Sequence, residues 1–151
     1  MDIQKDTAES SSALKLFVVL VKAYQAIQEI DYRDIRGYGF NPTEFAVLDL
    51  LYHKGPHPLQ QIGGKILITS GSITYVIDKL EKKGLIIRQP CEKDRRVIYA
   101  VLTASGQETM KLIFPRHAEV LCKALAGLSP EEQEAATQLL KKMGLYAQQL
   151  E

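Results

Sequence analysis

The chain has 151 residues, of which 46% are hydrophobic and 25% are charged, and its formal net charge is +1. This length fits one domain, and this composition argues against a disordered or fibrous protein. The charge is unevenly placed, because residues 59–103 hold eight lysines and arginines against four acidic residues. A basic segment in an otherwise mildly acidic chain favours binding to nucleic acid.

Cysteine and histidine are too few and too scattered for a disulfide framework or a zinc site. Cys91 and Cys122 lie far apart, and the three histidines show no metal-ligand spacing. The apolar run at residues 16–21 is too short for a membrane span, and no signal-peptide cleavage pattern follows it. We therefore expect a reduced, cytoplasmic protein that needs no metal or cofactor.

The first predicted helix covers residues 13–34 and is apolar on nearly all sides, after a polar, serine-rich arm at residues 1–12. Its apolar stripe at helical spacing is widened by further apolar residues until little polar face remains. Burial in a subunit interface and a central position in a monomer both fit this pattern. The interface is favoured because a second apolar helix is predicted at the other end of the chain.

Residues 41–68 predict two short helices. Asn41, Pro42 and Glu44 have the pattern of a helix start, with an N-cap, a proline in the first turn and a capping glutamate. This helix is expected to end at residues 54–56, and a second short helix follows with Ile62 and Ile66 on its inner face.

A third short helix is expected to begin at Thr69 and to end at Gly84, and the periodicity of the sequence changes there. Before Gly84, apolar residues recur at helical spacing, whereas residues 85–87 and 97–102 are runs of strand length rich in β-branched side chains. The polar, charged segment between these runs suits the turn of a hairpin. Three short helices followed by a hairpin with a cationic tip predict a winged helix-turn-helix over residues 41–103.

Two more helices are predicted in the last third of the chain. Thr103 is the expected N-cap of a helix to about residue 126, which Pro115 is expected to bend or break. Ser129 and Glu132 form a capping box that opens a last helix to residue 150. The expected fold is mainly α with a small β-hairpin wing (α+β), in a single domain of residues 1–151. Residues 13–34 and 104–150 are expected to form a dimerisation base.

The small, hydroxyl-rich start of the third helix suits the major groove of DNA, because its free amides and hydroxyls can reach phosphates and base edges. The expected DNA contacts on this helix are Ser70, Gly71, Ser72, Thr74, Tyr75 and Lys79. Lys82 and Lys83 are expected on a solvated face. Simple helix capping is the alternative for the hydroxyl cluster.

The hairpin tip carries Asp94, Arg95 and Arg96. An arginine on a narrow hairpin can enter a minor groove, and a neighbouring aspartate can hold it in place through a charge-assisted hydrogen bond. A charged turn that only keeps the hairpin soluble is the alternative interpretation.

Residues 67–106 resemble the MarR family of transcriptional regulators. The resemblance rests on the S-G-S-I-T-Y-V-I-D-K-L-E-K-K-G-L run, the D-R-R wing and the L-T-A-S-G exit, and it extends to residues 41–44 and 128–132. It implies a homodimeric regulator, usually a repressor, that binds a pseudo-palindromic operator on double-stranded DNA. It also places the minor-groove arginine at Arg96 and its partner at Asp94.

The resemblance further implies release from DNA by a small, often phenolic ligand or by cysteine oxidation. Aromatic and titratable candidates for a ligand cleft are Tyr24, Tyr38, Phe40, His53 and His117. The first helix has no cysteine near its start, unlike the peroxide-sensing members, so Cys91 near the wing is the candidate for a redox alternative. A winged helix used for protein contact is a third possibility. No catalytic motif supports an enzyme.

Overall fold

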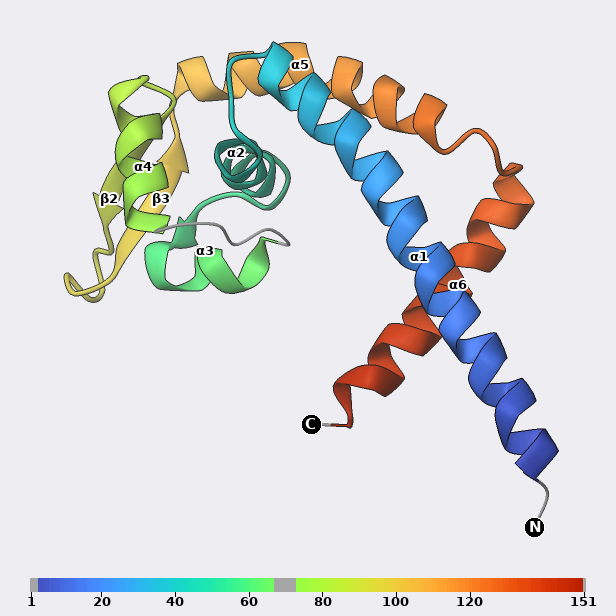
Figure 1. Ribbon diagram of the computed structural model, residues 1–151. Coiled ribbons are helices and arrows are strands. Elements are labelled where there is room, and N and C mark those ends of the chain that lie inside the picture. Colours follow the sequence, from blue (N-terminus) through green and yellow to red (C-terminus); the bar gives the residue numbers. More distant parts are fainter. Residues whose placement is uncertain (1–2, 67–72, 151) are drawn as a thin grey trace.

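The computed structural model describes residues 3–66 and 73–150, which form six helices and three short strands (Figure 1). In chain order the elements are α1 (Ile3–Gly37), α2 (Pro42–Lys54), β1 (His57–Pro58), α3 (Leu59–Lys65), α4 (Ile73–Lys82), β2 (Ile86–Pro90), β3 (Ile98–Leu102), α5 (Ala104–Ala124) and α6 (Pro130–Gln148). The strands form one antiparallel sheet in the order β1-β3-β2, with Ile86 opposite Leu102 and Pro90 opposite Ile98. The predicted class, mainly α with a small β-hairpin wing, is confirmed.

The compact part of the molecule is a head made of α2, α3, α4 and the sheet, with α5 and the C-terminal end of α1 packed over it (Figure 1). Each short helix is marginally stable on its own and gains its stability by packing its apolar stripe against the others. The stripes meet in a single core. Its fully buried side chains are Val47, Leu48, Leu51, Ile62, Ile77, Leu80, Ile86 and Met110.

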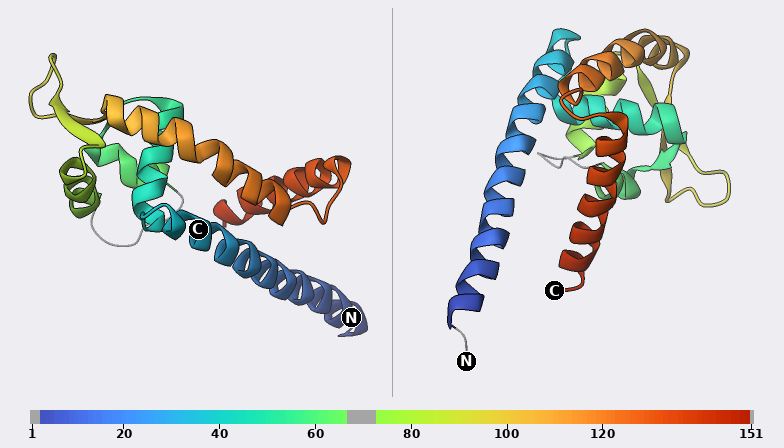
Figure 2. Two further views of the ribbon diagram at one scale, coloured as in Figure 1. Left: turned by 90° about the horizontal axis from the view of Figure 1, so that it is seen from above. Right: turned by 90° about the vertical axis from the view of Figure 1, so that its right-hand side faces the viewer.

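The long helices project away from this head. α6 crosses the N-terminal part of α1 in Figure 1, but the right-hand view of Figure 2 shows the two helices apart, so they do not pack along each other. No residue of α6 is buried. The bulk of the apolar surface on both helices is therefore left uncovered within the described chain.

One prediction about these helices was wrong, and one of two alternatives for another is excluded. Residues 3–12 belong to α1 and are not a loose arm. Once a long helix is nucleated, each added residue costs little, and serine does not stop it. Pro115 was expected to bend α5 or to break it, and the break is absent because α5 is one helix through this residue. Met110 and Ile113 before the proline and His117 after it are all buried, and this packing on both sides holds the helix in one piece.

The predicted caps of α2, α5 and α6 are present. Asn41 and Glu44 form a capping box on α2, Ser129 and Glu132 form another on α6, and Thr103 caps α5 by accepting from the amide of Gly106.

The end of α4 is fastened to the start of α5 by a close backbone contact. Gly84 has φ +75°, and the Thr103 hydroxyl donates to its carbonyl oxygen at 2.6 Å. The Thr103 amide donates to the Leu85 carbonyl oxygen at 3.0 Å. A Cβ atom on Gly106 would lie 2.2 Å from that same oxygen, so only glycine allows this approach.

Candidate nucleic-acid interface

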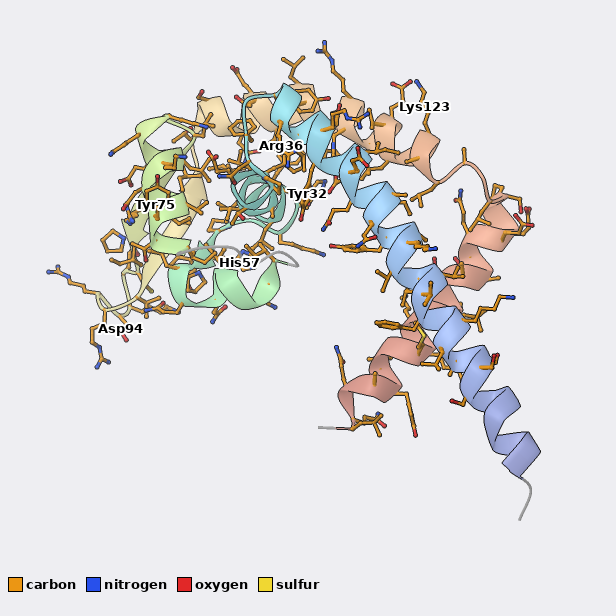
Figure 3. The ribbon with its side chains drawn as sticks, viewed as in Figure 1. Tyr32, Arg36, His57, Tyr75, Asp94 and Lys123 are labelled. Atoms are coloured by element: carbon orange, nitrogen blue, oxygen red, sulfur yellow. The ribbon has the colours of Figure 1, made fainter. Side chains whose placement is uncertain are left out.

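The outward face of α4 presents polar and aromatic side chains at the edge of the head. Thr74 is exposed, and Tyr75 stands out from the helix with 62% of its surface exposed (Figure 3). The ammonium of Lys79, one turn later, lies 5.4 Å from the centre of the Tyr75 ring, within the range of a cation–π contact. This pair gives the helix a cationic, partly ordered outer face.

The sequence places three further candidate contacts, Ser70, Gly71 and Ser72, just before α4. They lie outside the residues that the structure describes, as does Thr69, the expected N-cap.

The wing is the hairpin of β2 and β3, and its tip projects from the head beyond α4 (Figures 1 and 3). Backbone hydrogen bonds from Cys91 to Val97 and from Val97 to Asp94 close the turn, at 2.8 and 3.0 Å. Arg95 and Arg96 are both exposed at this tip. With Lys93, which is also exposed, the tip presents three cationic side chains to solvent.

Asp94 orders one of these two arginines. Its Oδ1 accepts hydrogen bonds from the amide and the Nε of Arg96, both at 3.1 Å, and its Oδ2 accepts from an Nη of Arg96 at 3.2 Å. The side-chain and backbone hydrogen bonds from Arg96 lower the pKa of Asp94. The Arg96 side chain nevertheless stays 90% exposed, so the guanidinium is oriented without being covered.

Thr74 and Arg96 line a common depression, although they belong to different elements. The depression lies between α3, α4 and the wing, and its other lining residues are Leu59, Gln60, Ile73 and Ile98. The helix face and the wing therefore form one continuous surface.

Not every basic residue of this segment is free to meet an anion. Arg88 on β2 pairs with Asp78 at 2.6 Å and with Glu81 at 3.0 Å, which ties the wing to α4. Lys83 pairs with the buried Glu44 at 2.8 Å. The Lys83 side chain is still 38% exposed, as expected for a solvated face, but its ammonium forms an ion pair that the sequence did not predict.

A cavity of about 440 Å³ lies behind this surface, between α1, α2 and α5. Eight of its fourteen lining residues are apolar, and the other six are Asp31, Asp49, His53, Lys54, Lys65 and His117. The rings of His53 and Phe114 meet edge-to-face with centroids 4.4 Å apart.

Asp49 contributes an unusual acceptor to the cavity. His53 Nδ1 lies 2.9 Å from Oδ1 of Asp49, but it hydrogen-bonds the Asp49 carbonyl oxygen at 3.0 Å instead. Oδ1 is buried and has no hydrogen-bond partner among residues 3–66 and 73–150. A buried acceptor without a donor is costly, so this oxygen is suited to accept from a bound hydroxyl.

His117 joins α5 to α1 at the wall of the cavity. Its Nε2 lies 2.9 Å from Asp31 and its Nδ1 2.8 Å from Asp34, and its ring is buried. A neutral imidazole has one N–H, so binding two carboxylates requires a second proton on the ring or a proton on one carboxyl group. Burial raises the pKa of Asp31 against the opposing charge of His117. Burial and the nearby Asp34 raise the pKa of Tyr38.

The chain resembles known transcriptional regulators over most of its length. MarR is the family whose profile matches, over residues 40–98. The HTH-type transcriptional regulator MhqR of Bacillus subtilis is 52% identical over 140 residues, which cover 93% of this chain and 97% of MhqR. YkoM, another HTH-type transcriptional regulator of B. subtilis, is 46% identical over 150 residues, which cover 99% of this chain and 97% of YkoM. The chain belongs to the MarR family of transcriptional regulators.

Solved structures of MarR-like regulators share the fold. BpsR of Bordetella bronchiseptica, whose DNA binding is regulated by 6-hydroxynicotinic acid, is 26% identical with a TM-score of 0.73 over 83% of this chain and 90% of BpsR. The MarR family regulator Sco3205 of Streptomyces coelicolor, solved in complex with DNA, is 20% identical with a TM-score of 0.78 over 89% of this chain and 86% of Sco3205. As a MarR regulator, this protein is a DNA-binding transcription factor and not an enzyme.

The sequence-based ligand candidates of this MarR regulator separate in space. His53 and His117 line the 440 Å³ cavity, whereas Tyr24, Tyr38 and Phe40 do not. Tyr24 is exposed on α1, Tyr38 lines a shallower depression on another side of α1, and Phe40 is buried in the core.

Sequence reasoning missed part of the cavity lining. Asp49 and His53 are four residues apart on α2, so helical spacing alone could have paired them. Asp31 and His117 come from distant helices, and nothing in the sequence brings them together.

Proposed function

We propose that this MarR-family regulator is a homodimeric repressor that binds a pseudo-palindromic operator and leaves it when a small phenolic ligand enters the cavity. The observation that carries the proposal is the continuous surface of α4 and the wing, with Tyr75, Lys79 and the Asp94-oriented Arg96 directed outward. α4 would enter the major groove with Thr74 and Tyr75, preceded by Ser70, Gly71 and Ser72. The wing would place Arg96 in the adjacent minor groove, flanked by Arg95.

The uncovered apolar helices support the dimer. Phe17 on α1 is 63% exposed and Leu139 on α6 is 67% exposed, and both belong to long rows of exposed apolar side chains. Monomeric proteins rarely expose such large apolar surfaces. A second copy that contributes the same two helices would cover them and set two heads at a fixed spacing, as a two-fold operator requires.

Lipid is the alternative partner for α1. By length and composition alone, Ser10–Gly37 is long and apolar enough to cross a membrane. The same helix, however, places Ile35 in the core of the head and holds His117 through Asp31 and Asp34. A span of α1 would draw these carboxylates towards hydrocarbon at a cost of several kcal/mol, so we assign the surface to a second copy and the protein to the cytoplasm.

Phe17→Asp is expected to convert the dimer into a monomer, because it would bury two uncompensated charges in the apolar interface. Sedimentation velocity at micromolar concentration measures this change directly. Glu29→Gln, an exposed change on the same helix, serves as the control and should leave the mass unchanged. A parent protein that sediments as a monomer, or that enters lipid vesicles, would contradict the dimer.

The cavity supports release by a phenol. A volume of about 440 Å³ is ample for a one-ring ligand, and more than half of the lining residues are apolar. The Oδ1 atom of Asp49 lies 2.9 Å from Nδ1 of His53 but accepts no hydrogen bond within the described chain. A phenol hydroxyl can donate to Oδ1 while the ring packs beside Phe45 and Phe114. The cavity also adjoins the His117 link between α1 and α5, so a ligand there can alter how the head sits on the dimer base.

Asp49→Leu is expected to weaken the binding of one-ring phenols by about tenfold while leaving ligand-free operator binding unchanged. The acceptor is removed, but Asp49 lines the cavity and not the depression shared by α4 and the wing. Titration of phenol, resorcinol and salicylate against the protein–operator complex measures the concentration needed for release. Tyr24→Phe, outside the cavity, is the control. If Tyr24→Phe impairs release of the operator by phenols and Asp49→Leu does not, the ligand binds outside this cavity.

A further inference from the structure

Lys83 directly follows α4, and its ammonium crosses to the loop between α1 and α2. The Nζ atom donates to Oε2 of Glu44 at 2.8 Å and to the carbonyl oxygen of Gly39 at 3.3 Å. It also lies 4.8 Å from the centre of the Phe40 ring. The Lys83 side chain is 38% exposed, but its ammonium is already engaged by a carboxylate, a carbonyl oxygen and an aromatic ring within the protein.

The acceptor of this contact is itself fixed and buried. The Glu44 side chain is only 3% exposed. Its Oε1 accepts from the Asn41 amide at 3.2 Å, while Oδ1 of Asn41 accepts from the Glu44 amide at 2.8 Å. One oxygen of the carboxylate thus caps α2 and the other receives Lys83. No other cation pairs with Glu44 in the parts of the chain that the structure describes, and a buried carboxylate without a cation is strongly disfavoured.

The contact acts at the end of α4 that is remote from the residues expected to read DNA. Thr74 and Tyr75 lie in the first turn of α4, whereas Lys83 follows its last residue. The ten residues of α4 span about 15 Å, so a tilt of about 10° around the Lys83 end would move the first turn by about 2.6 Å. A shift of that size is enough to disrupt base contacts.

We propose that Lys83 is a positioning residue for operator recognition. Its ion pair with Glu44 locks the C-terminal end of α4 to the capping box of α2 and thereby sets the angle at which α4 enters DNA. Lys83 does not itself contact DNA. This inference rests on the proposed operator binding, and it concerns how the reading helix is held rather than what it touches.

The direction in which Glu44→Gln changes DNA affinity distinguishes a positioning role from a general effect of charge on DNA binding. If charge alone mattered, Glu44→Gln would raise DNA affinity, because it removes a negative charge from a DNA-binding head. If the ion pair positions α4, the same change should lower operator affinity. Glutamine at this position retains the capping box, so the helix start is preserved while the ion pair is removed.

The experiment measures the dissociation constant for the operator over a range of salt concentrations, by fluorescence anisotropy, for the full-length dimer. Lys83→Gln and Glu44→Gln are each expected to weaken operator binding by about tenfold, and the double variant by no more than either single one, because paired residues are not additive. The salt dependence should stay that of the parent. Lys83→Arg, which keeps the charge, should restore much of the affinity.

Lys82→Gln is the matched control, because Lys82 is the neighbouring exposed lysine and forms no ion pair within the described ranges. It should change operator affinity by less than about twofold, in the range of a neutral surface substitution. Thermal melts of every variant report folding. Lys83→Gln leaves the Glu44 carboxylate buried without a cation and could therefore unfold. In that case the operator affinities of the double variant and of Lys83→Arg are compared with the parent instead.

Two results would overturn the inference. In the first, Lys83→Gln lowers the salt slope by about 1.8, the change expected when one phosphate per protomer is no longer neutralised, and Glu44→Gln tightens binding. Lys83 would then be a phosphate-binding residue. In the second, all variants bind the operator as the parent does. A parent that shows no preference for operator over random DNA would instead refute the proposed function, and so the two failures are distinguishable.

Discussion

Arg96→Ala is expected to weaken operator binding by about 100-fold, or about 3 kcal/mol shared between the two wings of a dimer, while the protein stays folded. The Arg96 guanidinium is 90% exposed and is oriented by Asp94, so its removal takes away a prepared cation without disturbing the core. The negative potential of a narrow minor groove makes such a cation particularly favourable. Anisotropy titrations at fixed salt, against operator and random DNA, measure the decrease in affinity and its sequence dependence.

Arg95→Ala is the matched control for this prediction. Arg95 is the adjacent exposed arginine, and it has no ion pair within residues 73–150. Arg95→Ala should weaken operator binding less than Arg96→Ala does. It should also weaken binding to operator and random DNA equally, because it removes a charge but not an oriented side chain. Equal effects of the two variants, or an unchanged operator preference in Arg96→Ala, would show that Asp94 does not prepare Arg96 for DNA.

Gly106→Ala is expected to destabilise the fold by about 3 kcal/mol or more. The new Cβ atom would lie 2.2 Å from the carbonyl oxygen of Leu85, a backbone atom that cannot move aside without disturbing Thr103. The same shift would break the Thr103 cap of α5, which accepts from the Gly106 amide at 3.0 Å. For a domain of this size, the midpoint of thermal unfolding should fall by about 10 °C.

The control for this prediction is Gly144→Ala. Gly144 lies inside α6 with nothing within 4 Å of an added Cβ atom, so alanine should be neutral or slightly stabilising through its helix propensity. Urea denaturation of both variants and of the parent measures the free energies of unfolding that this prediction compares. A Gly106→Ala protein as stable as Gly144→Ala would contradict the close contact between the α4–β2 turn and α5.

Local signals in the sequence predicted most of the fold. The capping patterns at Asn41 and Ser129 and the change of periodicity at Gly84 each depend on neighbouring residues, and the structure has all three. The start of α1 was predicted wrongly, and the break that was one of two expected effects of Pro115 does not occur. Both depend on helix propagation and tertiary packing, which outweigh the preferences of single residues.

The candidate site was less accessible to sequence reasoning. The Asp94–Arg96 pair could be predicted because the two residues are near neighbours on a turn. By contrast, the Lys83–Glu44 ion pair joins residues 39 positions apart, and the His117–Asp34 contact joins residues 83 positions apart. Only the folded chain brings these charges together. A lysine at a helix end looks the same in sequence whether it faces solvent or a buried carboxylate.

The central claim is that the protein reads DNA as a symmetric dimer. It is tested most directly by footprinting the purified protein on the DNA upstream of its own gene, at fixed salt and with excess random DNA, together with the mass of the complex. We expect protection of one inverted repeat by two protomers, with half-sites about one helical turn apart. Protection by a single protomer, or no preference over random DNA, would contradict this claim.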